Sequence, residues 1–252
     1  MAYLNDINDF LCNILKLNDF SKDYSNNGLQ VEGAMNVKKM VFGVDASKAL
    51  FEHAVTLDAD MIFVHHGISW ADGIKYFTGR EAELLSLLFK NEISLYAAHL
   101  PLDAHPEFGH NARIAEMINL ERQIPFGTYC GSKIGFSGMI SRTSASKLGA
   151  IVAKKLNAKF TLYGEDREIR KIGIISGGSG SDGILETATE GLDCLITGEV
   201  GHSSWHLINE LGICVVSCGH YKTEVPGVKA VMKKLNATFD IESVFIDIPT
   251  GL

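Results

Sequence analysis

The fold is indicated first by residues 39–67, which read KMVFGVDASKALFEHAVTLDADMIFVHHG. Two short apolar runs, Lys39–Asp45 and Met61–His65, enclose an amphipathic segment of helical period at Lys48–Thr56. A strand, a helix and a second strand of this length form a βαβ unit, in which the two strands lie parallel. The same alternation continues in both directions, so we predict an α/β protein with mostly parallel sheets flanked by helices.

The remaining strand-like runs lie at Ile93–His99, Ile134–Ser141, Lys159–Tyr163, Lys171–Ile175, Cys194–Thr197, Ile213–Cys218 and Val244–Ile248. Further helical segments are predicted at Asn5–Leu15, Glu81–Lys90, Asn111–Ile118, Ser146–Lys155, Gly183–Glu190, His202–Leu211 and Val228–Leu235. The order of strands and helices before residue 103 resembles the order after residue 171, which favours two related α/β lobes. We predict a first lobe over 1–126, a connecting segment over 127–165 and a second lobe over 166–252, packed tightly together.

Composition excludes several classes of protein. The 252 residues are 46% hydrophobic and 21% charged, as in an ordinary globular protein and unlike a disordered chain, a collagen or a coiled coil. No apolar run reaches the roughly 18–20 residues that a membrane span needs. Acidic residues stand near the N-terminus where a signal peptide has bases, and five cysteines lack zinc-ribbon spacing, so we expect a cytoplasmic protein. The net charge of −7 disfavours binding to nucleic acid.

Polar side chains gather where the predicted strands end. His65 and His66 follow one buried run, and His99 and Asp103 follow the next. His220 and Glu224 follow the run Ile213–Cys218 in the second half of the chain. Because ligands of open parallel sheets bind beyond the carboxyl ends of the strands, these groups are candidates for one site.

Five of these side chains, His65, His66, Asp103, His220 and Glu224, offer three imidazoles and two carboxylates. Five ligands exceed the needs of a closed four-coordinate zinc site but suit two divalent ions. Nitrogen and oxygen donors without thiolate favour Zn²⁺, Mn²⁺ or Fe²⁺ over Ca²⁺. Such a pair of ions acidifies a bridging water and polarises a substrate oxygen. The alternative is a turn with one exposed and one hydrogen-bonded histidine at His65-His66, an acid favoured by a helix dipole at Glu224, and a capping or turn role for Asp103.

At these residues the sequence resembles the Nif-three-like (NGG-interacting-factor-like) proteins, which are often named GTP cyclohydrolase 1 type 2 homologues. The stretches that carry the resemblance are Asn27-Gly28-Leu29-Gln30-Val31-Glu32-Gly33, Val44-Asp45-Ala46-Ser47, Val64-His65-His66-Gly67, His99-Leu100-Pro101-Leu102-Asp103-Ala104-His105-Pro106, Thr197-Gly198-Glu199 and Gly219-His220-Tyr221-Lys222-Thr223-Glu224. They span residues 27–224, and jointly and in this order they are specific.

The resemblance implies the Nif-three-like fold and a dinuclear metal site. His66 and Asp103 are implied as ligands of one ion, His65 and His220 as ligands of the other, and Glu224 as a bridge. It also implies a toroidal homohexamer and a substrate related to GTP. Some relatives carry two histidines near His202, whereas residue 203 is serine here.

Several other residues are candidates with two readings each. His99 is a partner of the metal ligands or a proton shuttle, or else a buried histidine bonded to backbone. Glu199 and His202 contact substrate or orient a water molecule, or else cap a helix. The Gly/Ser loop at 176–183 resembles a phosphate-cradling loop but lacks the Walker pattern, which favours an ordinary helix start with Asp182 as its N-cap. His53, His105, His110 and His206 are expected to be solvated or structural.

We therefore predict a dinuclear metal-dependent hydrolase that acts on a small, nucleotide-like substrate. A metal-dependent phosphoesterase is the nearest enzymatic alternative. The non-enzymatic alternative is a metal-binding or regulatory ring.

Overall fold

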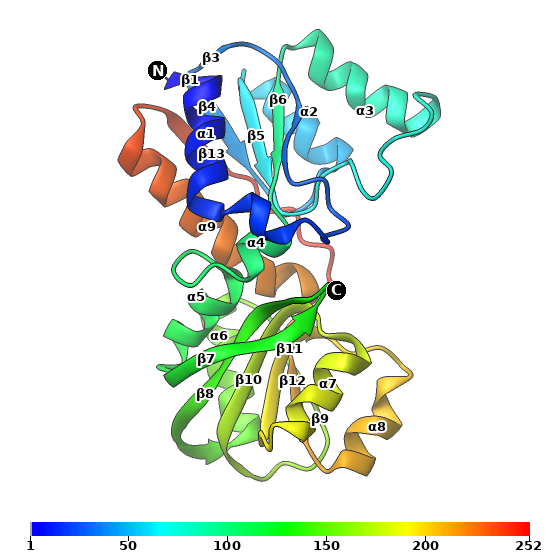
Figure 1. Cartoon of the computed structure of the whole chain (residues 1–252), viewed down its shortest axis with the longest axis vertical. Helices are drawn as coiled ribbons and strands as arrows, with labels where there is room; N and C mark the ends of the chain where they lie inside the picture. The colour runs from blue at the N-terminus through cyan, green and yellow to red at the C-terminus, as the bar shows by residue number, and fades with distance from the viewer. Residues whose placement is uncertain (1) are drawn as a thin grey trace. The chain divides into compact units, whose positions relative to one another are not determined.

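The computed structural model describes residues 2–252 and divides the chain into two compact units (Figure 1). The first unit holds the residues up to Leu102 together with Val228–Ile248. The second unit holds Asp103–Gly227 and Pro249–Leu252. The chain passes from one unit to the other within two helices, the short α4 (Leu100–Asp103) and the long α9 (His220–Thr238).

These boundaries differ from the lobes expected at 126 and 165. The C-terminal strand β13 (Glu242–Phe245) pairs in parallel with β4 (Lys39–Phe42), and so joins the sheet of the first unit. Much of the segment expected to be a connection instead forms β7 (Glu121–Tyr129) and β8 (Ser132–Ser144) of the second sheet. A strand needs a partner for its backbone groups, and sequence periodicity does not reveal which sheet supplies it.

The first unit is built on a five-stranded sheet of order β13-β4-β5-β6-β2. Strands β4, β5 (Met61–Val64) and β6 (Ser94–Ala97) run parallel to one another, as expected, and β2 (Gly28–Val31) closes one edge as an antiparallel strand. A separate two-stranded sheet pairs β1 (Ala2–Tyr3) with β3 (Asn36–Val37). All four residues of β5 and of β6 are buried, which matches their continuous apolar character.

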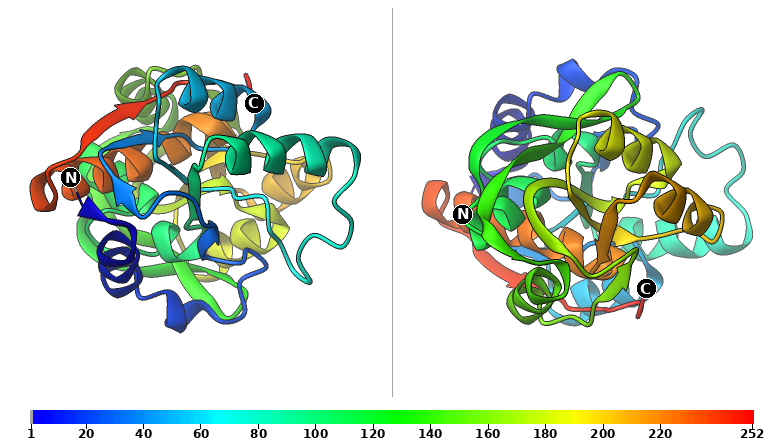
Figure 2. Two further views of the ribbon diagram at one scale, coloured as in Figure 1. Left: turned by 90° about the horizontal axis from the view of Figure 1, so that it is seen from above. Right: turned by 90° about the horizontal axis from the view of Figure 1, so that it is seen from below.

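Helices cover both faces of this sheet (Figures 1 and 2). On one face, α2 (Lys48–Thr56) and α3 (Gly79–Lys90) pack their leucines against Val41, Ile62 and Leu95. On the other face, the rings of Phe42, Phe63 and Tyr96 form a row, and α1 (Leu4–Leu15) approaches it through a Cys12 Sγ to Tyr96 Oη contact of 3.6 Å. The alternation of side chains along each strand separates these two apolar layers.

The second unit is built on a six-stranded sheet of order β7-β8-β10-β11-β12-β9. Its centre is parallel, because β10 (Glu168–Gly178), β11 (Cys194–Glu199) and β12 (Cys214–Ser217) pair in that sense. The flanking strands, including β9 (Thr161–Tyr163), pair antiparallel, so this sheet is mixed where a mostly parallel one was expected. The hairpin β7–β8 accounts for most of the difference, because a tight turn can only join antiparallel strands.

One face of the second sheet packs against α5 (His110–Met117) and α6 (Ala145–Leu156). The other face meets α7 (Gly180–Thr189), which contacts β7 and β11, and α8 (Ser204–Leu211) packs beside α7. Figure 1 shows α6 and α7 on opposite sides of these strands. A single turn of 3-10 helix at Leu17–Phe20 completes the elements. Among residues 2–252, no helix combines the length and the apolar character needed to cross a membrane.

Candidate metal centre

The carboxyl ends of the parallel strands in the first unit bring three histidines together. His65 and His66 follow β5 directly, and His99 follows β6 on the neighbouring strand. The ring centroids of His65 and His66 lie 4.5 Å apart, and His99 lies 5.1 Å from His65 and 5.6 Å from His66. One ligand atom from each ring lies within 4.8 Å of the others, a spacing that could hold a metal ion.

Each of these histidines is held through its Nδ1 atom. The acceptor is the carbonyl oxygen of Ala98 for His65 at 2.9 Å, Asp45 for His66 at 2.8 Å, and Asp23 for His99 at 2.8 Å. An oxygen without a proton can only accept, so Nδ1 carries the hydrogen and the lone pair of a neutral ring lies on Nε2. An imidazole bound to a metal usually donates its other N–H to a carboxylate or a carbonyl in this way.

Asp23 is the centre of a buried hydrogen-bond network. Its carboxylate accepts from the backbone N–H groups of Ser25 and Leu100 and from the side chain of Asn27, besides His99. Burial opposes ionisation of this carboxyl, but the hydrogen bonds and the charge of His99 outweigh it, and the pKa of Asp23 lies below its ordinary value. The side-chain oxygen of Asn27 in turn accepts from the backbone N–H of His99, so the amide nitrogen and the amide oxygen of Asn27 are both hydrogen-bonded.

In the second unit, three of the predicted ligands lie around two consecutive residues at the end of β10. The hydroxyl of Ser176 donates to Asp103 Oδ1 at 2.9 Å. Gly177 has a φ of +61°, and a Cβ atom there would lie 2.2 Å from Glu224 Oε1 and 3.2 Å from His220 Nε2. Only glycine fits this position, because it tolerates the positive φ and leaves space for the carboxylate.

His220 and Glu224 form a pair on the first turns of α9. Helix α9 begins at His220, earlier than the helix expected at Val228–Leu235, so the two residues occupy one helix face at positions i and i+4. His220 Nε2 lies 3.1 Å from Glu224 Oε1, and His220 Nδ1 lies 3.4 Å from Glu199 Oε1. The hydrogen bond with Glu224 raises the pKa of His220 to about 9, against the opposing effect of burial.

His110 lies near Asp103 but differs from the other histidines in its hydrogen bond. It is buried, and a ligand atom of its ring lies within 4.8 Å of one in Asp103. Its Nδ1 accepts from the backbone N–H of Gly227 at 3.1 Å, so a neutral ring carries its hydrogen on Nε2. That nitrogen is a donor, which suits the positioning of a carboxylate and not the binding of a metal ion.

Within each unit, the structure brings several of the predicted site residues together. His65, His66 and His99 belong to the first, and Asp103, His220 and Glu224 to the second, with Glu199 beside His220. His202 is exposed in the turn before α8, and its imidazole has no hydrogen bond within the described part of the chain. The Gly/Ser loop is the end of β10 and the start of α7, whose N-cap is Ser179 and not Asp182, which lies inside the first turn.

Sequence reasoning missed Asp23. It expected His110 to be solvated or structural, but did not place it beside Asp103. Asp23 stands in a polar stretch without periodicity, so only the tertiary contact with His99 reveals it. The signal that could have found His110 is its place at the start of a predicted helix just after Asp103.

Comparison with known proteins identifies the family of this chain. The model of the Duf34/NIF3 (NGG1p interacting factor 3) family matches residues 2–251. The chain belongs to the DUF34/NIF3 family. A family member from Archaeoglobus fulgidus, named GTP cyclohydrolase 1 type 2 homolog, is 44% identical over 249 residues, which cover 99% of each chain. A protein of the same name from Pyrococcus horikoshii is 43% identical over 251 residues, or 98% of this chain and 99% of that one.

Solved structures of similar proteins share the fold. TTHA1606 from Thermus thermophilus superposes with a TM-score of 0.90 at 33% identity, over 99% of this DUF34/NIF3 chain and 100% of that one. Reduced HcgD from Methanocaldococcus jannaschii superposes with a TM-score of 0.85 at 29% identity, over 98% of each chain. The resemblance to the Nif-three-like proteins, and with it the fold, is thus confirmed.

Proposed function

We propose that this protein is a metal-dependent hydrolase that holds two divalent metal ions per chain. The proposed ligands are His65, His66, Asp103, His220 and Glu224. In this assignment His66 and Asp103 bind one ion, His65 and His220 bind the other, and Glu224 bridges them.

The observation that carries the proposal is the shared orientation of the histidines at the strand ends. His65, His66 and His99 each donate Nδ1–H to an oxygen, which leaves Nε2 as a metal-binding lone pair. The space beside Gly177 supports the same reading, since it accommodates the Glu224 carboxylate next to His220. Nitrogen and oxygen donors of this kind suit Zn²⁺, Mn²⁺ or Fe²⁺.

Divalent ions in such a site lower the pKa of a water molecule and polarise an oxygen of the substrate. The residues of the chain hold the ligands in place: Asp45 fixes the ring of His66, Ser176 donates to Asp103, and Glu199 lies beside Nδ1 of His220. Asp23 fixes His99, to which we assign the positioning of a substrate or water molecule at the same strand ends.

The proposed substrate is a nucleotide-like molecule, because the similar proteins from Archaeoglobus fulgidus and Pyrococcus horikoshii carry the name GTP cyclohydrolase 1 type 2 homolog. Hydrolysis of a phosphoester is the alternative reaction for the same set of ligands. The two reactions differ in product, since ring opening of a purine leaves its phosphates attached and phosphoester hydrolysis releases phosphate.

The test is to strip the full chain of metal, reload it separately with Zn²⁺, Mn²⁺ and Fe²⁺, and measure both metal content and turnover. Substrates are GTP and p-nitrophenyl phosphate, with products separated by chromatography. The variant His66→Ala removes one proposed ligand, and His53→Ala is its control because His53 is exposed on α2.

We expect two ions per chain, and turnover that His66→Ala abolishes and His53→Ala retains. Two bound ions without turnover of either substrate would exclude the proposed hydrolase and leave a metal-binding protein. Fewer than two ions in the unaltered chain, or an unchanged metal content in His66→Ala, would contradict the proposed site itself.

A further inference from the structure

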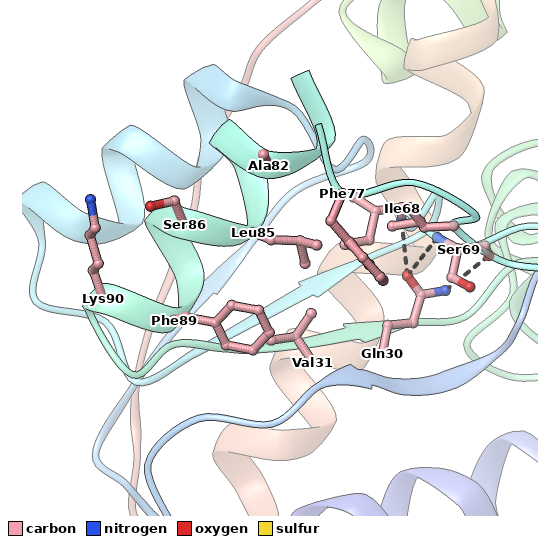
Figure 3. A pocket seen from close by; sticks show the side chains of 11 residues that line it. Gln30, Val31, Ile68, Ser69, Phe77, Ala82, Leu85, Ser86, Phe89 and Lys90 are labelled. Carbon is pink, nitrogen blue, oxygen red and sulfur yellow. Dashed lines mark hydrogen bonds between the residues drawn. The ribbon is translucent and has the colours of Figure 1, made fainter. Parts of the chain in front are cut away.

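A cavity of about 750 Å³ lies within the first unit, apart from every proposed metal ligand. It is bounded by α3, by the edge strand β2 and by the loop that follows His66 (Figure 3). Its volume is within the range of sites that bind small molecules. The walls are mostly apolar and include Val31, Ile68, Leu85 and Phe89.

The polar groups at one end of this cavity are already satisfied by the protein. Gln30 Oε1 accepts from the backbone N–H groups of Ile68 and Ser69, and its Nε2 donates to the carbonyl oxygens of Asn26 and Ser69. The Ser69 hydroxyl accepts from Asn26. These bonds brace the loop, and they leave that end of the cavity with little capacity to bind a polar ligand.

The opposite end of the cavity carries a cation. Figure 3 shows Lys90 at the far end of α3 from Gln30 and Ser69, with Leu85, Phe89 and Val31 between the two ends. The other cations near this helix are paired: Lys48 with Glu83, Lys75 with Asp72 and Arg80 with Glu81. Within residues 2–252, Lys90 has no carboxylate partner. In a chain of net charge −7, Lys90 thus places a cation without a carboxylate partner in the lining of an apolar cavity, at the last turn of α3.

We propose that this cavity binds a single-chain amphiphile with one anionic group, of the fatty-acid class. The hydrocarbon chain lies along Val31, Leu85 and Phe89, and the carboxylate meets Lys90. Burial of the chain supplies most of the affinity, since each buried methylene contributes about 0.8 kcal/mol to transfer from water. The ion pair at the exposed end supplies selectivity for an anion and contributes less.

The experiment titrates the full chain with dodecanoate by calorimetry, below the concentration at which micelles form. Dodecanol provides the same hydrocarbon without charge, and dodecyltrimethylammonium provides the opposite charge. Lys90→Glu tests the cation, with Arg80→Glu as its control on the same helix outside the cavity. Phe89→Ser tests the wall, with Tyr76→Ser as its control because Tyr76 is an exposed aromatic that does not line the cavity.

We expect one dodecanoate per chain. Lys90→Glu should weaken dodecanoate about tenfold and leave dodecanol unchanged, whereas Phe89→Ser should weaken both ligands. Both controls should bind like the unaltered chain. Circular dichroism checks that each variant is folded, and Lys90→Gln repeats the charge test without a new acid.

Three results would overturn the proposal. The first is no saturable binding of dodecanoate. The second is equal loss in Lys90→Glu and Arg80→Glu, or tighter binding of dodecyltrimethylammonium. The third is a combination of two observations: the unaltered chain does not bind dodecanoate, and Phe89→Ser has a different particle mass from the unaltered chain. That combination would assign the cavity to contact with a second copy.

Discussion

At the scale of single residues, the acceptor at Nδ1 distinguishes a histidine that can bind a metal from one that cannot. Oxygen acceptors fix the hydrogen on Nδ1 of His65, His66 and His99, whereas a backbone N–H fixes it on Nε2 of His110. Four buried or half-buried histidines therefore divide into three possible ligands and one donor. Residue type alone does not make that distinction.

The contact between Asp45 and His66 provides the first prediction. Replacing Asp45 by alanine removes the acceptor at 2.8 Å and frees the ring to rotate, so metal affinity should fall about 10- to 100-fold. Asp45→Asn should cost less, because its amide oxygen still accepts from Nδ1. Competition with a chromogenic chelator measures the affinity. Asp72→Ala, at an exposed aspartate paired with Lys75, is the control, and equal affinity in both alanine variants would contradict the assigned role.

The pKa of His220 provides the second prediction. Its value of about 9 lies above the ordinary 6.5, so the metal-free protein keeps this proton near pH 7 and must release it when the ring binds a metal. Calorimetry in buffers of different ionisation enthalpy should detect about one more proton released near pH 7 than near pH 10. The difference should vanish in His220→Asn.

The same pKa shift has a consequence for the stability of the metal-free protein. A raised pKa means that the folded state holds the proton more tightly, so the His220–Glu224 pair stabilises the fold fully below about pH 6.5 and loses its effect as the pH rises through about 9. In the calorimetric experiment, a release of protons that is identical near pH 7 and near pH 10 would show that His220 is neutral before the metal binds.

At the scale of elements, the sequence predicts most helices and the buried parallel strands, because their apolar periodicity is strong. Helix α2 begins and ends as expected, and α1 and α3 differ by one or two residues. The prediction fails at β7, where Pro125 and five exposed residues in succession hide a strand that owes its existence to pairing with β8. It also fails at the start of α9, because the helix was expected at Val228–Leu235 but begins at His220 and contains Pro226.

The end of β10 allows the third prediction, through a matched pair of glycines. Gly177 and Gly180 have φ values of +61° and +59°, but a Cβ atom at Gly180 would meet nothing within 4 Å. Each alanine variant should therefore lower the free energy of unfolding by about 1–2 kcal/mol from backbone strain. Only Gly177→Ala displaces the Glu224 carboxylate, and it alone should lower metal affinity, by about tenfold or more. Equal metal affinities would mean that Glu224 is not a ligand.

The hairpin β7–β8 provides the fourth prediction. Glu186 on α7 accepts from the backbone N–H groups of Gly127 and Thr128 and from Lys133 Nζ, and although burial opposes ionisation, these bonds hold its pKa below the ordinary value. Glu186→Ala leaves the two N–H groups without this acceptor and should lower the free energy of unfolding by about 1–3 kcal/mol at neutral pH. Denaturant titration measures it.

A lowered pKa also fixes the direction of the pH dependence for this variant. The contribution of Glu186 is present above about pH 4.5 and is lost as the pH falls further, so the difference between Glu186→Ala and the unaltered chain should shrink in acid. Glu190→Ala is the control, since Glu190 approaches Lys133 at 3.9 Å and should change stability little. A constant difference across the pH range would contradict the assigned role.

At the scale of the whole molecule, the chain returns to its first unit after building the second, and this could not be predicted from the sequence. Strand–helix alternation gives the class of fold, but any βαβ segment can join either sheet. The proposed metal ligands could be named from the sequence, because each one follows a predicted strand closely along the chain. Asp23, in contrast, became apparent only through its contact with His99.

The interleaved chain provides the last prediction: a fragment of residues 1–126 should not fold as an independent lobe. It lacks β13, which pairs with β4, and the part of α9 that contributes the buried side chains of Val228, Val231 and Leu235. Burial of each such side chain contributes about 1.5–3 kcal/mol, and three of them rival the whole stability of about 5–15 kcal/mol for a typical domain.

Thermal unfolding followed by circular dichroism should therefore show no cooperative transition for the fragment 1–126. Adding residues 228–248 in trans should restore one, because this segment supplies both the helix and the strand that complete the first sheet. Residues 204–227 belong to the second unit and should restore nothing when added in the same way. A cooperative transition in the fragment alone would instead favour a self-sufficient first lobe, with β13 and the end of α9 as additions that the core does not require.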